Sequence, residues 1–396
     1  MADASIPGLR RAYVLMGVAD GTLLPFIPLY LAQRGLGPGA IGAMLAASAL
    51  AALVAGLAWA YLADRRVGPE RLVVAATVAA ALVALSLPVA QGAAAIAAVI
   101  VVITIVRSPL ALLDPITLRR LRTTSRTDYA RIRLRMSAGW TASALATGAL
   151  YQVGGLRFIP FIYAPLSVAV GLWVWLRVRP EAVAEVEVAR PAVKVPAVPP
   201  AMVGFLVACL LLGISLAATQ NFLVLQIDYL GGGALLVGAA AAFQALTEIP
   251  TMGYTHVLSR RVSHRVLFAL GCGIYLAVFV AWAFVGSPLV AALLKLVIGV
   301  AFALTFVSAV MVANELTPAR LRATGQALMK AVLFGLAPIA GSLGGGLVYG
   351  SLGPRVMFLG ATLLVAAAGA VAVIAIPGRR RAPVEEPVLA TSAARP

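Results

Sequence analysis

The sequence predicts an all-α integral membrane protein with twelve transmembrane helices in two pseudo-symmetric six-helix bundles. Three observations carry this prediction: 62% hydrophobic and only 11% charged residues, apolar runs of membrane-spanning length, and an alternating charge pattern in the loops. Water-soluble chains average about 25% charged residues, so a soluble fold would have too little polar surface to cover these apolar residues.

Apolar runs repeat along the whole chain. As helices rising about 1.5 Å per residue, they are long enough to cross a hydrocarbon core of about 30 Å. We expect six spans before a polar, proline-rich stretch, at 11–31, 39–62, 71–89, 93–118, 129–153 and 158–176. Six more follow it, at 202–229, 234–258, 265–286, 288–314, 322–349 and 353–376.

Basic residues alternate between the two sides of these spans. The even-numbered gaps between spans and the two tails carry 25 of the 31 Lys and Arg residues, whereas the odd-numbered gaps carry only Arg34, Arg157 and Arg355. Short loops rich in Lys and Arg stay in the cytoplasm, so we predict a multi-pass protein of the cell inner membrane with both termini cytoplasmic. The net charge of +17 is thereby assigned to contact with membrane lipids, and no nucleic-acid partner is expected.

Thiol labelling tests this topology. Cysteines introduced by Glu185→Cys and Glu386→Cys should resist an impermeant thiol reagent in intact cells, because the charge pattern places both positions in the cytoplasm. Both should react once the membrane is permeabilised. Reaction of both from outside would invert the predicted topology.

Two polar segments divide the chain. We expect an N-terminal six-helix bundle at 1–176, a cytoplasmic linker at 177–201, a C-terminal six-helix bundle at 202–376 and a disordered tail at 377–396. The tripeptide Arg-Arg-Val at 65–67 recurs at 260–262, an offset of 195 residues that places both copies between the second and third spans of a half. Such an offset is expected for a membrane protein built of two parallel repeats.

Polar side chains deep inside a span are costly, so they are the candidates for a functional site. Charged or amide residues of this kind are Asp20, Arg107, Gln220, Asn221, Gln244, Glu248, Lys295 and Lys330. Spans three, six, nine and twelve have no charge in their interiors, which predicts outer supports around an inner polar cavity. Counted from the cytoplasmic ends of their spans, Asp20, Arg107, Glu248 and Lys330 share one layer about 12–17 Å deep.

Left unpaired near the membrane centre, each of these charges costs roughly 2.5–3.5 kcal/mol. We therefore expect the pairs Asp20–Arg107 and Glu248–Lys330. Two interpretations stay open for them: structural salt bridges, or a site for substrate and proton coupling. In the second interpretation Glu248 is the first candidate proton carrier and Asp20 the second.

Other kinds of site lack support in the residues. Cys209 and Cys272 lie in separate apolar spans, and His256 and His264 have no acidic partner motif, so no disulfide and no metal site is expected. The sequence contains no P-loop, no H-E-x-x-H motif and no nucleophile elbow. We therefore predict that the chain is not an enzyme and has no catalytic residues.

Residues 60–68, Ala-Tyr-Leu-Ala-Asp-Arg-Arg-Val-Gly, resemble the G-x-x-x-D-R-x-G signature of the major facilitator superfamily, with alanine at the first glycine. The resemblance implies a gating role for Asp64, Arg65 and Gly68. A narrower resemblance, to the branch of lactose permease, phenylpropionate permease and nucleoside–proton symporters, rests on segments 25–31, 114–140, 248–250 and 315–327. In lactose permease an arginine of this kind helps to bind sugar together with an acid in span four, which implies Arg133 and Asp114 as substrate-binding residues here.

The resemblance implies a secondary transporter that moves a small solute by alternating access. Residues 139–155 lack the glycine-proline motif of the superfamily's antiporters, which favours proton-coupled symport. A proton-coupled drug or metabolite exporter and a membrane sensor or scaffold without transport remain the alternatives. Three intramembrane cations, Arg107, Lys295 and Lys330, favour an anionic or polar neutral organic solute. The expected partners are this solute, the proton and membrane lipids; the proton gradient supplies the drive without a bound cofactor, and the chain is expected to be a monomer.

Overall fold

The chain folds into helices throughout the residues that the computed structural model describes, which are 5–65, 67–121, 126–178, 199–259, 261–318 and 321–378. Within these ranges there is no strand, as the sequence predicts. The physical reason is that backbone N–H and C=O groups in hydrocarbon must bond inside their own segment, and a single span achieves this only as a helix.

The helices of the N-terminal half follow the predicted spans. They are α1 (Ser5–Leu23), η1 (Leu24–Phe26), α2 (Ile27–Gln33), α3 (Pro38–Arg65), α4 (Pro69–Ala84), α5 (Gly92–Arg107), η2 (Ser108–Leu112), α6 (Leu113–Arg120), α7 (Arg126–Gly154), η3 (Leu156–Phe158) and α8 (Ile159–Arg177). Two spans change to 3-10 geometry at prolines, Pro25 in η1 and Pro109 in η2. Proline lacks an N–H and clashes with the preceding turn, so a distortion of the fourth span near Pro109 is expected from the sequence and is confirmed.

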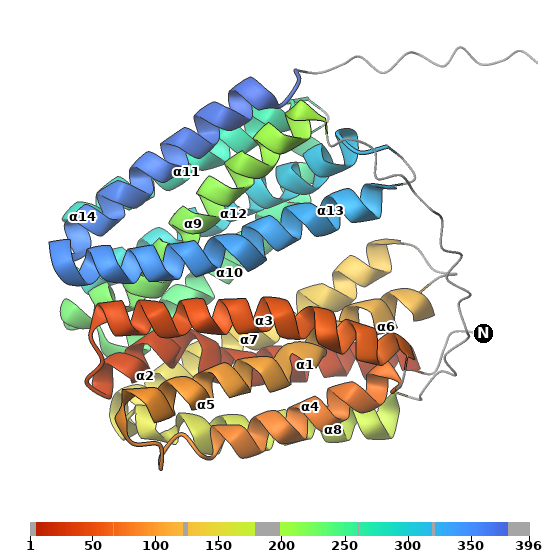
Figure 1. Ribbon diagram of the computed structural model, residues 1–396, viewed down its shortest axis with the longest axis vertical. Helices are drawn as coiled ribbons and strands as arrows, with labels where there is room; N and C mark the ends of the chain where they lie inside the picture. Colours follow the sequence, from red (N-terminus) through yellow and green to blue (C-terminus); the bar gives the residue numbers. More distant parts are fainter. Residues whose placement is uncertain are drawn as a thin grey trace, which may run out of the picture.

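The C-terminal half has fewer but longer helices. They are α9 (Pro200–Tyr229), α10 (Gly233–Leu258), α11 (His264–Phe284), α12 (Pro288–Glu315), α13 (Arg322–Lys330), the π-helical segment η5 (Ala331–Leu336) and α14 (Ala337–Ala375). Figure 1 shows α14 as two helical pieces, because the chain folds back at Gly353, where φ is 86° and ψ is 170°. Glycine reaches this left-handed region without a steric penalty.

Nine helices of the described ranges are long and apolar enough to cross a membrane. One of them, Thr324–Ala375, contains both the eleventh and the twelfth expected spans. Two more expected spans correspond to α4, which has only 16 residues, and to α7, whose first turns are rich in arginine. The all-α membrane class is confirmed, whereas the number twelve stays a prediction.

The two halves of the sequence form two groups of helices. In Figure 1, α1 to α8 lie in the lower group, coloured red to yellow, and α9 to α14 lie in the upper group, coloured green to blue. The outermost helices are α4 and α8 below and α11 with the second part of α14 above, which are the spans expected to support an inner cavity. The predicted linker and tail fall largely outside the described residues, so their boundaries stay predictions.

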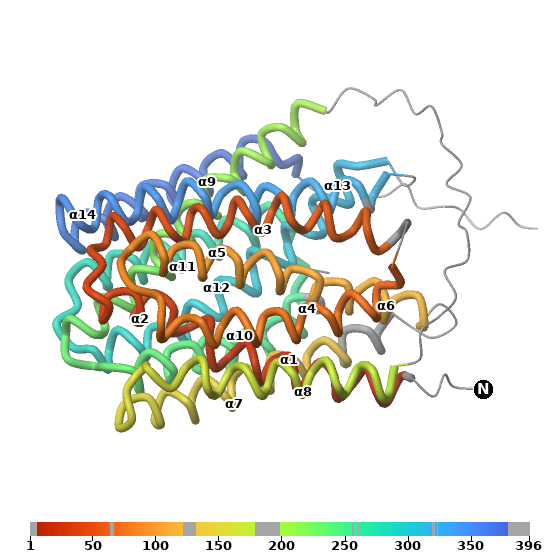
Figure 2. Tube along the Cα trace, turned by 60° about the horizontal axis from the view of Figure 1, so that its bottom comes forward, coloured from red at the N-terminus to blue at the C-terminus, as the bar shows by residue number. Residues whose placement is uncertain are grey.

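The two groups meet closely at the end remote from the N terminus, which we call the distal end (Figures 1 and 2). There α3 meets α14 at Gly42 and Gly346, and α7 meets α10 at Gly148 and Gly238. A Cβ added to any of these glycines would overlap backbone atoms of the opposing helix. Small residues are needed where membrane helices approach so closely.

Candidate functional site

A buried ion pair joins α1 to α5. Asp20 lies on α1 and is 4% exposed, and Arg107 is the last residue of α5. The Arg107 guanidinium donates a hydrogen bond to the Asp20 carboxylate, so the predicted pair is confirmed. Each charge lowers the cost of burying the other inside the membrane.

Two polar groups at this pair are buried: Arg107 Nε, which has no hydrogen-bond partner among the described residues, and the Tyr163 hydroxyl, which lies beside Arg107 and Ser167. Tyr163 lies on α8, is 1% exposed and is within electrostatic range of both charges of the pair. A buried polar group without a partner costs about 1–3 kcal/mol, so a solute that bonds to Arg107 Nε would recover that energy. Tyr163 could not be recognised from the sequence, because a tyrosine in an apolar span is equally consistent with packing.

A second acid in this half is held by two neighbours. Asp114 on α6 accepts a hydrogen bond from the Tyr13 hydroxyl at 2.7 Å and another from the Arg133 guanidinium of α7. The structure thus brings together the arginine and the acid that the lactose permease resemblance implies. The Arg133 side chain is 53% exposed and that of Asp114 32%, so this pair is open to water or to a solute.

The buried cation of the C-terminal half is Lys295 on α12, which is 8% exposed. Its ammonium group donates to Oε1 of Gln220 on α9 and, at 2.8 Å, to Oε1 of Gln244 on α10. Gln220 Nε2 also donates to Oε1 of Gln244 at 3.3 Å. These three residues, which we call the lysine–glutamine cluster, connect α9, α10 and α12, and Lys295 has no carboxylate in ion-pair contact among the described residues.

Glu248 lies one turn beyond Gln244 on α10 and is partly buried. Lys295 is within electrostatic range of its carboxylate, but no cation in the described ranges lies within the 4.0 Å of an ion pair. The predicted partner Lys330 is wrong, because its side chain at the end of α13 is exposed. Depth along a span does not determine the direction in which a side chain points, and Lys295 takes the place that Lys330 was expected to have.

Asn221, although adjacent to Gln220 in sequence, makes a different contact. Its Nδ2 donates to Oγ of Ser342 on α14 at 3.0 Å, which ties α9 to α14. The predicted binding and coupling residues therefore fall into three groups, Asp20 with Arg107, Asp114 with Arg133, and Gln220 with Lys295 beside Glu248, while Asn221 and Lys330 lie outside them.

The predicted gating residues lie where α3 leads into α4. Asp64 and Arg65 are the last two residues of α3, and their side chains fall outside the part of the structure that is described. Gly68 is the residue before α4. Two residues later, Glu70 forms an ion pair with Arg120 at 3.3 Å, with side chains only 4% and 5% exposed. Both residues flank spans, so the sequence analysis did not single them out.

The C-terminal half has a matching contact in which acid and base are exchanged. Nδ1 of His264, the first residue of α11, lies 2.7 Å from Oε1 of Glu315, the last residue of α12. Glu315 follows Arg120 by 195 residues and His264 follows Glu70 by 194 residues, nearly the offset of the Arg-Arg-Val tripeptide. This correspondence supports the internal repeat predicted from the sequence.

Residues 8–360 match the family model described as the MFS_1 like family, which covers most of the chain. The chain belongs to this family. It is therefore a membrane transporter of the major facilitator superfamily, as the resemblance in the sequence implies. No curated protein matches the MFS_1-like chain in sequence.

Solved transporter structures share the fold of this MFS_1-like chain. The nucleoside transporter NupG has a TM-score of 0.80 at 16% identity, covering 95% of this chain and 100% of NupG. A bacterial homologue of the human lysosomal transporter Spinster, inward-facing and unoccupied, has a TM-score of 0.70 at 14% identity, covering 94% and 96%. The human organic anion transporter MFSD10 (TETRAN) has a TM-score of 0.62 at 14% identity, covering 93% and 99%. At such low identity the likeness shows the fold alone.

The described residues contain no group of three or more His, Cys, Asp or Glu side chains that could hold a metal ion. Cys209 and Cys272 are both free and buried. The candidate site of the MFS_1-like chain consists of the buried Asp20–Arg107 pair, the more exposed Asp114–Arg133 pair and the lysine–glutamine cluster beside Glu248.

Proposed function

We propose that the chain is a proton-coupled symporter that moves a small polar or anionic organic solute across the cytoplasmic membrane by alternating access. The observation that carries this proposal is the difference between the two halves: the N-terminal half pairs its buried arginine with an acid, whereas the C-terminal half holds its buried lysine with glutamine oxygens. Buried charges inside a membrane protein are retained where they bind solutes or relay protons.

The polar groups of the site suit an anionic or hydroxyl-rich solute. Arg107 Nε offers unsatisfied hydrogen-bonding capacity in one half, and the hydrogen bonds of the Lys295 ammonium group in the other half go to neutral oxygens. An anion could therefore displace a glutamine oxygen from Lys295 and gain a charge-assisted hydrogen bond. The names of two solved relatives by fold, a nucleoside transporter and an organic anion transporter, agree with this solute class.

Glu248 is the proposed proton carrier. Its carboxylate has no cation in ion-pair contact within the described ranges, yet it lies close enough to Lys295 to respond to it. A small movement of α12 toward α10 would bring the ammonium group to the carboxylate and favour release of the proton, and the reverse movement would favour uptake. Solute binding at Lys295 and proton binding at Glu248 would in this way compete for the same cation.

Alternating access in this proposal uses the distal end as one gate. The glycine crossings Gly42–Gly346 and Gly148–Gly238 close that end, and Gln152 Oε1 accepts a hydrogen bond at 3.1 Å from the Leu235 backbone N–H across the two halves. The arrangement corresponds to a state whose access path faces the opposite end, the predicted cytoplasmic side. Opening of the distal end requires both crossings to separate.

Gly238→Leu should prevent this closure and reduce transport by about tenfold, since the leucine side chain meets the Ala144 carbonyl of α7 and overpacking costs about 1–3 kcal/mol. A cysteine introduced by Asn221→Cys should then react faster with an impermeant thiol reagent added from the distal side. Gly253→Leu is the matched control on the same helix, because a Cβ there has no neighbour within 4 Å. Equal reactivity in the two variants would contradict the assignment of this gate.

Proteoliposomes test the function itself. A pH-sensitive dye inside the vesicles reports proton entry when nucleosides and small organic anions are added one at a time from outside. The proposal expects proton entry with a solute, and accumulation of that solute only under an inward proton gradient. Proton exit coupled to solute entry would show an antiporter, the exporter alternative, and would contradict symport. Solute movement without any proton flux would show that the chain is a transporter but is not coupled to protons.

A further inference from the structure

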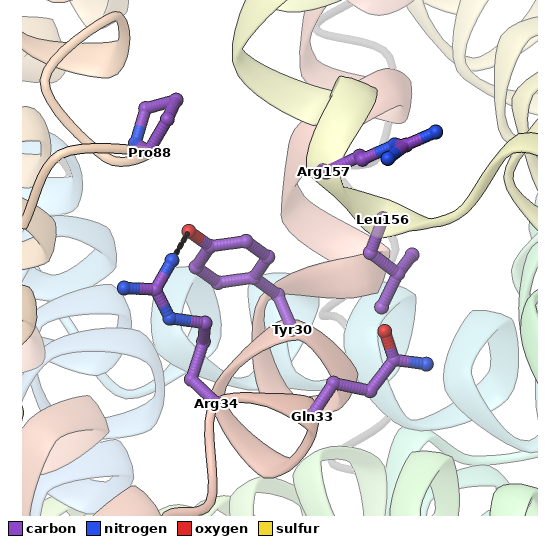
Figure 3. A pocket seen from close by; sticks show the side chains of 6 residues that line it. All are labelled: Tyr30, Gln33, Arg34, Pro88, Leu156 and Arg157. Carbon is purple, nitrogen blue, oxygen red and sulfur yellow. Dashed lines mark hydrogen bonds between the residues drawn. The ribbon is translucent and has the colours of Figure 1, made fainter.

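A polar cavity of about 230 Å³ lies at the distal end of the N-terminal half (Figure 3). Its lining residues are Tyr30, Gln33, Arg34, Pro88, Leu156 and Arg157. Arg34 and Arg157 are two of the three cations that the sequence places in distal loops, and Arg355 is the third. Neither Arg34 nor Arg157 forms an ion pair with a carboxylate in the described ranges, so the cavity carries two uncompensated positive charges.

Arg34 is fixed in place by neutral partners. It donates to the Tyr30 hydroxyl at 3.2 Å, as Figure 3 shows, and to the Ala90 carbonyl oxygen. The Tyr30 hydroxyl in turn donates to the Leu87 carbonyl oxygen at 3.3 Å. These bonds satisfy backbone oxygens of the segment between α4 and α5 and hold the guanidinium, but they leave its charge available for an anion.

A second hollow, an apolar groove of about 430 Å³, lies between α4 and α8. Its walls are Val78, Ala81, Leu82, Leu85, Phe161, Ala164, Pro165 and Val168. The two hollows are adjacent in the chain, because Leu85 precedes Pro88 by three residues and Phe161 follows Arg157 by four, about one helical turn. The cavity is thus lined on one side by the segments just after α4 and just before α8, at the junction with the groove, and on the other side by Tyr30, Gln33 and Arg34.

The length of α4 places this junction near the depth of lipid headgroups. With 16 residues, α4 is about 24 Å long, which is less than the hydrocarbon thickness of about 30 Å. The chain continues from Ala84 through turns rather than helix until α5 begins at Gly92. A short span is accommodated by local thinning of the bilayer, which draws headgroups toward its end.

We propose that this site binds one anionic glycerophospholipid of the distal leaflet, with its phosphate between Arg34 and Arg157 and an acyl chain in the groove between α4 and α8. The two uncompensated guanidinium groups account for the anionic headgroup, and the apolar groove directly beside them accounts for the chain. Arg or Lys near a membrane surface contributes about 1 kcal/mol toward an anionic lipid, so two of them give a preference of about 30-fold over a zwitterionic lipid.

Purified protein in detergent tests the site with three probes: dioleoyl phosphatidylglycerol, dioleoyl phosphatidylcholine and glycerol 3-phosphate. Native mass spectrometry should show about 30-fold greater retention of phosphatidylglycerol than of phosphatidylcholine. The melting temperature should rise by at least about 2 °C with phosphatidylglycerol alone. Equal retention of the two lipids, or an equal rise in melting temperature with glycerol 3-phosphate, would overturn the proposal in favour of a chain-only or a headgroup-only site.

Variants localise the effect. Arg157→Gln should reduce the preference for phosphatidylglycerol about fivefold. The Arg157 side chain lies over the Phe158 ring and forms no ion pair within the described ranges, so the fold should persist. Arg355→Gln is the matched control, because Arg355 is also an exposed distal arginine over an aromatic ring, that of Phe284, but lies in the other half. If Arg355→Gln lowers the preference as much as Arg157→Gln, the attraction is general and the proposed site is wrong.

The groove has its own pair of variants. Val168→Phe should fill the groove and lower retention of both lipids, since Val168 lines it and is 41% exposed. Val356→Phe, at a residue of α14 that is 43% exposed and lies away from the groove, should leave retention unchanged. Unchanged retention in Val168→Phe would remove the acyl chain from the groove and contradict the proposal.

Discussion

Asp20→Asn should lower the free energy of unfolding by about 3–5 kcal/mol and abolish transport. The substitution leaves the Arg107 guanidinium charged, buried and without its acid. Removal of one partner of a buried ion pair lowers the free energy of unfolding by about 3–5 kcal/mol. The melting temperature in detergent measures the first effect, and solute uptake into proteoliposomes at equal protein density measures the second.

Two further variants separate structure from binding at this pair. Asp228→Asn removes a partly buried acid at the end of α9 that has no ion pair within the described ranges, so it should change stability little. Asp20→Asn combined with Arg107→Gln removes both charges and should restore most of the stability without restoring transport. If the double variant transports as well as the wild type, the pair is only a structural salt bridge.

Glu248→Gln should abolish accumulation of solute driven by a pH gradient while preserving exchange of solute at equal pH. Glutamine has the shape of the protonated acid and cannot release a proton. The variant would therefore still change between its two states with solute bound, but solute movement would no longer be coupled to proton movement. Counterflow of labelled solute measures exchange, and uptake under an imposed pH gradient measures coupling. We expect coupling to fall at least a hundredfold, to the level of vesicles without protein; a hundredfold corresponds to about 2.7 kcal/mol.

Glu315→Gln is the control for this prediction. Glu315 is 54% exposed at the end of α12 and contacts His264, so its loss removes an acid of the same half without touching the lysine–glutamine cluster. Lys295→Met combined with Glu248→Gln removes both Glu248 and Lys295, the nearby cation that replaces the predicted partner Lys330. A variant with both substitutions that still accumulates solute against its gradient would show that the proton is carried elsewhere, and Asp20 would be the next residue to test.

The Asp20–Arg107 pair could be predicted from the sequence, because the prediction depends only on the free-energy cost of an unpaired charge in the membrane and on the depth of each residue along its span. Two opposite charges at similar depth in an apolar bundle are stabilised strongly by pairing. The same reasoning failed for Glu248, since depth counted from one end of the bundle put Lys330 in the right layer and Lys295 outside it. The side chain of Lys330 is exposed, because the rotation of α13 about its axis buries Gly325 and Met329 and turns Lys330 outward, and a count of depth does not include this rotation.

Contacts that involve tyrosine and flanking charges were beyond prediction for a different reason. Tyr13 and Tyr163 sit in apolar spans where an aromatic ring has ample reason to pack, so their hydroxyl groups gave no separate signal. Glu70 and Arg120 looked like ordinary loop charges beside the membrane, although an acid in the first turn of α4 is a recognisable feature. Helix positions were predictable because the apolar runs and their prolines mark them, as η2 at Pro109 shows.

Three arginine–carboxylate pairs in the described part of the N-terminal half, at Arg107, Arg120 and Arg133, also bear on how the membrane voltage acts on the protein. Each arginine keeps its charge at every accessible pH and is matched by an acid, so these pairs add almost no net charge to the moving part. The electrical charge carried per cycle would then be the sum of the solute and the proton taken up beside Lys295. A neutral solute would make the cycle electrogenic, driven by about 2.3 kcal/mol per 100 mV, whereas a monovalent anion would make it electroneutral and insensitive to voltage.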